Sequence, residues 1–166
     1  MARLVLVGLP GTGKTTLARA LGQHWRCAVI DTDDAVALDV GMPASHYLRE
    51  EGEGAFRDHE IKALREALGT DGVISTGAGV VTTPEARVLI AKELTLWLDC
   101  DDDILLERVG DGERPLLGDD HAAAIKDLRR RREGWYRENS RARVDASGSP
   151  DEVLNAVLST VESLSS

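Results

Sequence analysis

Residues 8–16 of the chain read GLPGTGKTT, and this stretch matches the phosphate-loop pattern Gly-x4-Gly-Lys-Ser/Thr. An unbroken apolar run, Leu4–Val7, precedes it, as expected of a parallel strand that is buried on both faces. Apolar residues at helical spacing follow it, namely Leu17, Ala18, Ala20 and Leu21. Because strand, glycine-rich loop and helix come in the order that the pattern requires, we interpret the stretch as a nucleotide-binding loop rather than a simple glycine-rich turn.

The loop offers three kinds of group that can hold a nucleoside triphosphate. Its glycines let successive backbone N–H groups point inward, and the helix that follows adds its positive N-terminal end. Lys14 can reach the terminal phosphates, and the Thr15 hydroxyl can coordinate Mg2+. We therefore expect the protein to bind a nucleoside triphosphate with Mg2+ through the loop residues Gly11, Thr12, Gly13, Lys14, Thr15 and Thr16.

The chain has the length and composition of a globular protein. Its 166 residues suit a single domain, 1–166, in which 42% of the residues are hydrophobic and 30% are charged. No apolar run approaches the ~20 residues of a membrane helix. The N-terminus enters the first strand directly, so we expect no signal segment, no membrane partner and a cytoplasmic location. We also expect a monomer.

The net charge of the chain is -9, from 20 Lys and Arg against 29 Asp and Glu. This balance argues against nucleic acid and against an acidic membrane as partners, because both need a basic surface. The inferred nucleotide is itself an anion. Since charges beyond a Debye length of ~8–10 Å are largely screened, a few local arginines can still dominate its site. Clustered arginines are therefore the residues to find.

Strands and helices alternate along the rest of the chain. Apolar periodicity predicts four further strands, at Cys27–Ile30, Val73–Thr76, Leu94–Leu98 and Arg143–Asp145. The predicted helices are Ala35–Val40, Ala44–Glu50, Glu53–Leu68, Pro84–Lys92, one that opens at Asp101–Asp103, His121–Asn139, and a last one after a capping box at Ser149–Glu152. Five strands that alternate with helices predict an α/β fold, a three-layer sandwich with a five-stranded parallel sheet.

Candidate ligand-binding residues follow the second and third predicted strands. Open α/β folds bind ligands at the carboxyl edge of the sheet. In an extended segment Asp31 and Asp33 project to the same side, so that one can face Mg2+ and the other the acceptor substrate. The alternative is that an aspartate only caps the next helix, and Asp34 is the favoured cap. Gly77–Gly79 form either a tight turn or a place where another molecule approaches the backbone.

Arginines occur at three places that an anionic substrate can use. A glutamate stands four residues before Arg57 and another three after it, a spacing that usually means a surface ion pair. Arg114 lies in the glycine-flanked segment 110–120, which has no periodicity and which we interpret as a mobile lid. Arg129–Arg132 point around a helix, so that at most one or two of them share a site and the rest are solvated.

With these segments placed, the chain resembles the shikimate kinase family, whose members are small relatives of the nucleoside monophosphate kinases. The likeness extends nearly end to end. It is carried by the phosphate loop, Asp31-Thr32-Asp33, Gly52-Glu53 with Phe56-Arg57 and Glu60, Gly77-Ala78-Gly79, Arg114-Pro115-Leu116-Leu117, and Arg132 with Tyr136. The resemblance implies a P-loop NTPase fold with an acceptor-binding region at about 33–60 and a lid at about 110–120. It also implies ATP-dependent phosphorylation of the 3-hydroxyl of shikimate, a step of aromatic amino acid biosynthesis.

On the acceptor side, the resemblance implies a role for each matching residue. Asp33 would hold the shikimate hydroxyls and act as the catalytic base. Arg57 and Arg132 would grip the shikimate carboxylate, and the backbone of Gly77-Ala78-Gly79 would lie beside the ring. Planar guanidinium groups suit this task, because they pair with a carboxylate through two parallel hydrogen bonds.

On the nucleotide side, the resemblance implies that Lys14 and Arg114 act on the transferring phosphate. Thr15 would coordinate Mg2+, which Asp31 would face through water. Arg108 would flank the adenine. These groups suit phosphoryl transfer, which needs mainly alignment and neutralisation of the charge on the moving group.

The chain departs from the family pattern in three places. Ala78 stands where the family has the central glycine of Gly-Gly-Gly, and the family's Arg-x-Pro-Leu-Tyr reads REGWY at residues 132–136. A glutamate expected shortly after the aspartates is replaced around Ala37-Leu38. None of these changes removes a charged group that the chemistry needs. Two other functions stay open: a kinase of this fold for gluconate or a nucleoside monophosphate, and a non-catalytic ATP-binding regulatory protein.

Overall fold

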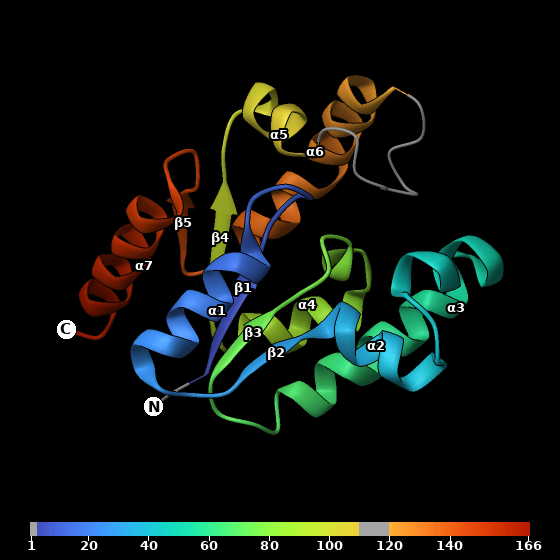
Figure 1. Ribbon diagram of the computed structural model, residues 1–166, viewed down its shortest axis with the longest axis horizontal. Coiled ribbons are helices and arrows are strands. Elements are labelled where there is room, and N and C mark those ends of the chain that lie inside the picture. Colours follow the sequence, from blue (N-terminus) through green and yellow to red (C-terminus); the bar gives the residue numbers. More distant parts are fainter. Residues whose placement is uncertain (1–2, 110–119) are drawn as a thin grey trace.

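The structure, a computed structural model, describes residues 3–109 and 120–166. In these residues five parallel strands form one sheet in the order β2-β3-β1-β4-β5, with helices on both faces (Figure 1). The strands are β1 Leu4–Val7, β2 Val29–Asp31, β3 Val73–Ser75, β4 Leu94–Asp99 and β5 Ala142–Asp145. The expected α/β sandwich with a five-stranded parallel sheet is therefore confirmed.

The helices divide between the two faces of the sheet. They are α1 Lys14–Trp25, α2 Thr32–Val40, α3 Ala44–Ala67, the 3-10 helix η1 Val80–Thr82, α4 Pro84–Ala91, α5 Asp102–Val109, α6 His121–Glu138 and α7 Pro150–Leu164. A hydrophobic core lies on each face of the sheet, and alternate residues of β1 pack into each of them. Val5 and Val7 pack with α3 to α6, whereas Leu4 and Leu6 pack with α1 and α7. The central strand is buried on both faces for this reason, which explains its unbroken apolar run.

The start of α2 differs from the prediction and changes how the aspartates are placed. The helix begins at Thr32, three residues before the predicted Ala35, and its N-cap is Asp31 rather than Asp34. The Asp31 carboxylate accepts hydrogen bonds from the backbone N–H groups of Asp33, at 2.9 Å, and Asp34, at 3.1 Å. Asp31 ends the strand and Asp33 lies in the first helical turn. The expectation that both project from one extended segment is therefore wrong.

Helix α3 bends where the sequence predicts a break. Gly52 has φ 87° and ψ 170°, outside the helical region, and it separates a short first part from a longer second part. These parts correspond to the predicted helices Ala44–Glu50 and Glu53–Leu68. The capping box of α7 is also present, because Ser149 and Glu152 each accept a hydrogen bond from the other's backbone N–H.

Within residues 3–109 and 120–166, the helices are too short or too polar to cross a membrane.

Candidate active site

One cavity of about 690 Å3 opens at the carboxyl edge of the sheet and joins the phosphate loop to the acceptor-side residues. Every predicted site residue that the structure describes lies on its wall. These residues are Gly11, Thr12, Gly13, Lys14, Thr15, Thr16, Asp31, Asp33, Arg57, Gly77, Ala78, Gly79, Arg108 and Arg132. Arg114 and most of the predicted lid, residues 110–119, lie outside the described part of the chain.

The phosphate loop packs directly against the neighbouring strand β4. A Cβ atom at Gly8 would lie 2.4 Å from the carbonyl oxygen of Leu98, so only glycine allows this approach. Gly13, at φ 88°, is the N-cap of α1 and has no side chain to cap the helix, so the first N–H groups of α1 are available to an anion. The Lys14 ammonium lies over the loop and donates to the carbonyl oxygens of Gly8, at 2.8 Å, and Leu9, at 3.0 Å. Positive groups thus gather at one end of the cavity.

A hydroxyl and a carboxylate meet beside the loop. The Thr15 hydroxyl donates to Asp31 Oδ2 at 2.7 Å, and the Ser75 hydroxyl lies 3.5 Å from the Thr15 hydroxyl. The other Asp31 oxygen caps α2, which fixes the carboxylate in place. Mg2+ binds oxygen ligands and commonly takes one or two from the protein, with the rest from phosphates and water. Thr15 and Asp31 fit this requirement, although no larger cluster of potential metal ligands occurs in residues 3–109 and 120–166.

Arg57 is a cavity residue and not the surface ion pair that its spacing usually indicates. Its side chain is only 12% exposed. It donates to Glu60 Oε1 at 2.8 Å and to Glu53 Oε1 at 3.0 Å, so both neighbouring glutamates orient the guanidinium. The second oxygen of Glu60 is buried and has no hydrogen-bond partner in the described part of the chain. Ion pairs at this helical spacing usually lie on the surface. The Arg57–Glu60 pair is instead largely buried and lines the cavity.

The Gly77–Gly79 turn is shaped by the acceptor-side residues. A Cβ atom at Gly79 would lie 2.2 Å from the Arg57 guanidinium, and one at Gly77 would lie 2.7 Å from Glu60 Oε2. Ala78 is half-buried and does not have a positive φ, so its methyl group is accommodated without strain. A side chain at either end of the turn would therefore displace the Glu60 or Arg57 side chain, whereas the departure from Gly-Gly-Gly at position 78 does not disturb the turn.

Of the four consecutive arginines on α6, Arg132 faces the cavity. It is 2% exposed, and its Nε and Nη1 atoms have no hydrogen-bond partner among the described residues. Arg130 and Arg131 are exposed and pair with Asp127. Arg129 is not simply solvated as expected, because it joins a polar network at the end of β4.

Tyr136 holds α6 against the turn. Its hydroxyl donates to the carbonyl oxygen of Ala78 at 2.5 Å, and its ring stacks on Trp97 with the centroids 6.1 Å apart. Arg132 lies one turn before Tyr136 on the same helix. The contact therefore sets where the Arg132 guanidinium lies relative to the acceptor end of the cavity.

Two carboxyl groups on the acceptor side have raised pKa values. Burial, and then the neighbouring Asp31, raise the pKa of Asp33 to about 6. Burial raises the pKa of Glu60 to about 7, although the Arg57 guanidinium acts in the opposite direction. A carboxyl group whose pKa lies near neutrality can accept a proton during catalysis, and this suits the role predicted for Asp33.

The sequence did not point to the loop between β5 and α7 as part of the site. Gly148 from this loop and Pro150, the first residue of α7, line the cavity beside Arg108, whose guanidinium donates to the carbonyl oxygen of Gly148 at 3.2 Å. These residues carry no chemical group that marks a binding site. Only the position of β5 next to β4 brings the loop to the nucleotide end of the cavity.

Comparisons with known proteins identify relatives over almost the whole chain. The profile of the family described as shikimate kinase matches residues 10–162. A shikimate kinase of Corynebacterium jeikeium (strain K411) is 36% identical and covers 96% of this chain and 88% of its own length. A shikimate kinase of Enterococcus faecalis (strain ATCC 700802 / V583) is 31% identical and covers 95% of this chain and 97% of its own length.

The fold leads to the same group of proteins. The solved structure of shikimate kinase from Acinetobacter baumannii in complex with shikimate has a TM-score of 0.87 and 26% sequence identity, and the match covers 96% of this chain and 94% of that one. Sequence profile, relatives and structure agree over nearly the full length. The chain therefore belongs to the shikimate kinase family.

Proposed function

We propose that the protein transfers the terminal phosphoryl group of ATP to the 3-hydroxyl of shikimate and releases ADP and shikimate 3-phosphate. One observation carries the proposal: a single cavity joins the phosphate loop to Arg57 and Arg132, so a nucleotide and a small carboxylic acid can meet in it. Membership of the family supports the same reaction, and the related Acinetobacter baumannii structure is described as a complex with shikimate.

Arg57 and Arg132 bind the shikimate carboxylate in this proposal. The Arg132 guanidinium is buried and has no carboxylate within ion-pair distance in residues 3–109 and 120–166. Burial lowers its pKa from the usual value, which reflects the cost of holding a cation away from water. An arriving carboxylate offsets that cost and makes charge-assisted hydrogen bonds.

Asp33 accepts the proton of the attacking hydroxyl. It lies at the carboxyl edge of the sheet, and its electrostatic neighbours include Lys14 on the nucleotide side and Arg57 on the acceptor side. The oxygen of the 3-hydroxyl forms a bond to the terminal phosphorus, the bond from that phosphorus to the ADP oxygen breaks, and the hydroxyl proton passes to the Asp33 carboxylate. The increase in reaction rate comes mainly from alignment of the two substrates. The transition state of phosphoryl transfer is loose, so the protein has little covalent chemistry to perform.

The nucleotide end of the cavity binds ATP. Lys14 and the N-terminal N–H groups of α1 hold the phosphates, and Arg108 flanks the adenine beside the loop between β5 and α7. Thr15, and Asp31 through water, would hold Mg2+, which would supply neutralisation of the charge on the phosphate oxygens. Arg114 keeps its proposed role on the transferring phosphate.

The proposal includes a monomeric, cytoplasmic enzyme. The residues proposed to bind the nucleotide and the acceptor line one continuous cavity within a single chain. The dependence on ATP supports the cytoplasm as the compartment.

The decisive experiment measures ADP release in a coupled assay with shikimate, gluconate and AMP as separate acceptors. We expect shikimate alone to stimulate ADP release and to yield a phosphorylated product. Stimulation by gluconate or AMP instead would assign the enzyme to another acceptor. ATP binding without stimulation by any of the three would favour a regulatory protein.

We expect activity to fall on the acidic side at a higher pH than an ordinary aspartate would produce. Asp33 must be ionised to accept a proton, and its pKa is raised to about 6. Below that pH kcat/KM for shikimate should decrease about tenfold per pH unit, with Glu60, at about 7, broadening the transition. The measurement is kcat/KM from pH 4.5 to 8 at saturating ATP, and a constant value down to pH 5 would contradict it.

A further inference from the structure

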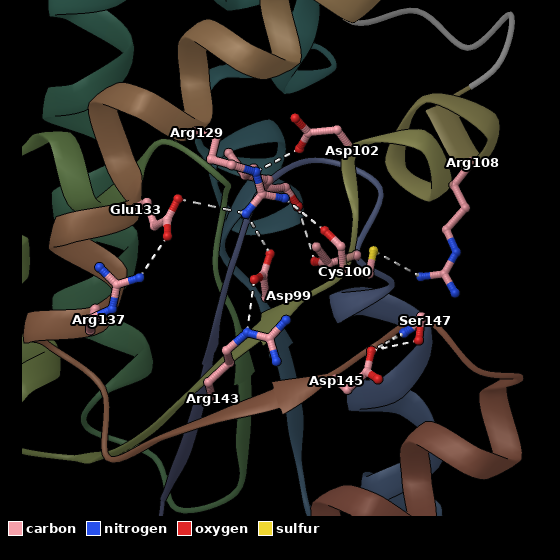
Figure 2. A network of polar contacts seen from close by, with 12 residues as sticks. Asp99, Cys100, Asp102, Arg108, Arg129, Glu133, Arg137, Arg143, Asp145 and Ser147 are labelled. Atoms are coloured by element: carbon pink, nitrogen blue, oxygen red, sulfur yellow. Dashed lines mark hydrogen bonds and ion pairs between the residues drawn. The ribbon is translucent and has the colours of Figure 1, made fainter.

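Arg129 joins three segments of the chain through its guanidinium (Figure 2). It donates to Asp99 Oδ1 at 2.9 Å, to Asp102 Oδ1 at 2.6 Å and to the carbonyl oxygen of Cys100 at 2.7 Å. The other oxygen of Asp99 accepts from Arg143 at 2.9 Å, so Asp99 lies between two guanidinium groups. All three nitrogens of Arg129 are thus used, and its side chain is only 20% exposed.

The partners of Arg129 belong to the nucleotide side of the molecule. Asp99 ends β4, which pairs with β1, the strand that leads into the phosphate loop. The residue before it, Leu98, has its carbonyl oxygen in close contact with Gly8 of that loop. Asp102 begins α5, the helix that carries Arg108. The contacts of Arg129 therefore hold α6 at a defined position relative to the phosphate loop.

Arg132 follows Arg129 by three residues on α6, so the two side chains leave the helix on neighbouring faces. Arg129 holds the helix on the nucleotide side, and Tyr136 holds it on the acceptor side through Ala78. Arg132 lies between these two anchors. Because no described carboxylate fixes its guanidinium, its position in the cavity depends on where the helix lies.

We propose that Arg129 is a positioning residue, which sets the place of Arg132 relative to the phosphate loop and so aligns the bound acid with the phosphoryl donor. The inference rests on the proposed function and adds a residue to it. Most exposed ion pairs contribute little, because solvent screens them and their side chains are mobile. Arg129 differs from these pairs in its three simultaneous contacts and its partial burial. A shift of about 1 Å in an aligning group can cost on the order of a hundredfold in rate.

The test is a double-mutant cycle that combines R129M with R132M. In the otherwise wild-type enzyme, R129M is expected to lower kcat/KM for shikimate by about 10- to 100-fold and to change KM for ATP by less than about twofold. In the R132M background, the same change is expected to alter kcat/KM by less than about twofold, because Arg129 acts through Arg132. Equal effects in both backgrounds would overturn the inference.

Matched variants separate positioning from loss of charge or of folding. R130M removes a neighbouring arginine that is 80% exposed, and we expect kcat/KM within about twofold of wild type. R129K keeps the charge but has one nitrogen in place of the three that reach Asp102, Asp99 and Cys100, so it should recover only part of the loss. If R129M does not fold, D99N takes its place in the cycle. Arg129 then keeps its contacts with Asp102 and Cys100, so D99N should lower kcat/KM less than R129M. This smaller effect should also vanish in the R132M background.

The outcomes also distinguish this inference from the proposed function. A wild-type enzyme that does not phosphorylate shikimate would overturn both. A wild-type enzyme that turns over shikimate, combined with independent effects of the two arginines, would overturn the role of Arg129 alone.

Discussion

Replacing Asp33 by asparagine is expected to lower kcat by about 10²- to 10⁴-fold, the range typical of a lost general base. The asparagine has nearly the same shape but cannot take the proton of the 3-hydroxyl. KM for ATP should change by less than about twofold, because the phosphates are held by the loop and Lys14. Steady-state kinetics with saturating ATP and varied shikimate provide the measurement.

The neighbouring residue offers a matched control for this change. Asp34 also lies in the first turn of α2, but it is exposed and is absent from the cavity wall. Asp34→Asn alters the charge of the helix terminus in the same way and is expected to leave kcat within about twofold of wild type. Wild-type turnover in a folded Asp33→Asn variant would rule out Asp33 as the base.

Replacing Gly79 by alanine is expected to raise the KM for shikimate by roughly 10- to 150-fold, which corresponds to the ~1.5–3 kcal/mol of a hydrogen bond to a charged group. The added methyl group would lie 2.2 Å from the Arg57 guanidinium. Gly79 has φ -89°, which any residue can adopt, so the backbone itself is not strained. The flexible guanidinium must therefore move away from the acceptor. Initial rates against shikimate concentration, with a thermal melt to verify folding, measure the effect.

Ala78, the residue before Gly79, provides the control, because removing its methyl group is expected to leave the KM for shikimate unchanged. Ala78→Gly restores the family's Gly-Gly-Gly and removes a methyl group that causes no strain, so the KM for shikimate should stay within about twofold. In an Arg57→Ala background, Gly79→Ala should add little, because the guanidinium that it displaces is already gone. An unchanged KM in the folded Gly79→Ala variant would show that the Arg57 guanidinium does not hold the acceptor.

The phosphate loop illustrates what local sequence determines. The glycines, Lys14 and Thr15 lie within a few residues of one another, between an apolar strand and a helix. Their arrangement depends on backbone conformations that the local residues themselves favour. The same is true of the break between the helices predicted at Ala44–Glu50 and Glu53–Leu68, which the structure has at Gly52, and of the predicted capping box of α7. Strand number and sheet type follow from alternation of apolar segments, which is again a local property.

The aspartates after β2 show where local rules stop. Asp31, Asp33 and Asp34 are all good N-cap residues, so propensity alone does not choose among them. Asp31 also reaches the hydroxyl of Thr15, sixteen residues earlier in the chain, and this contact favours it as the cap. The first turn of α2 then places Asp33 in the cavity. A tertiary contact thus decided which carboxylate caps the helix beside Thr15 and which lies in the first helical turn on the cavity wall.

The sequence by itself determined the nucleotide loop, the class of fold and the list of candidate arginines. Only the tertiary structure decided that Arg57 and Arg132 line one cavity, that Arg129 contacts the end of β4, and that Gly148 and Pro150 lie on the wall of the same cavity. The physical reason is desolvation. Helical spacing tells which face a side chain occupies, but whether water leaves that face depends on elements that are distant in the chain.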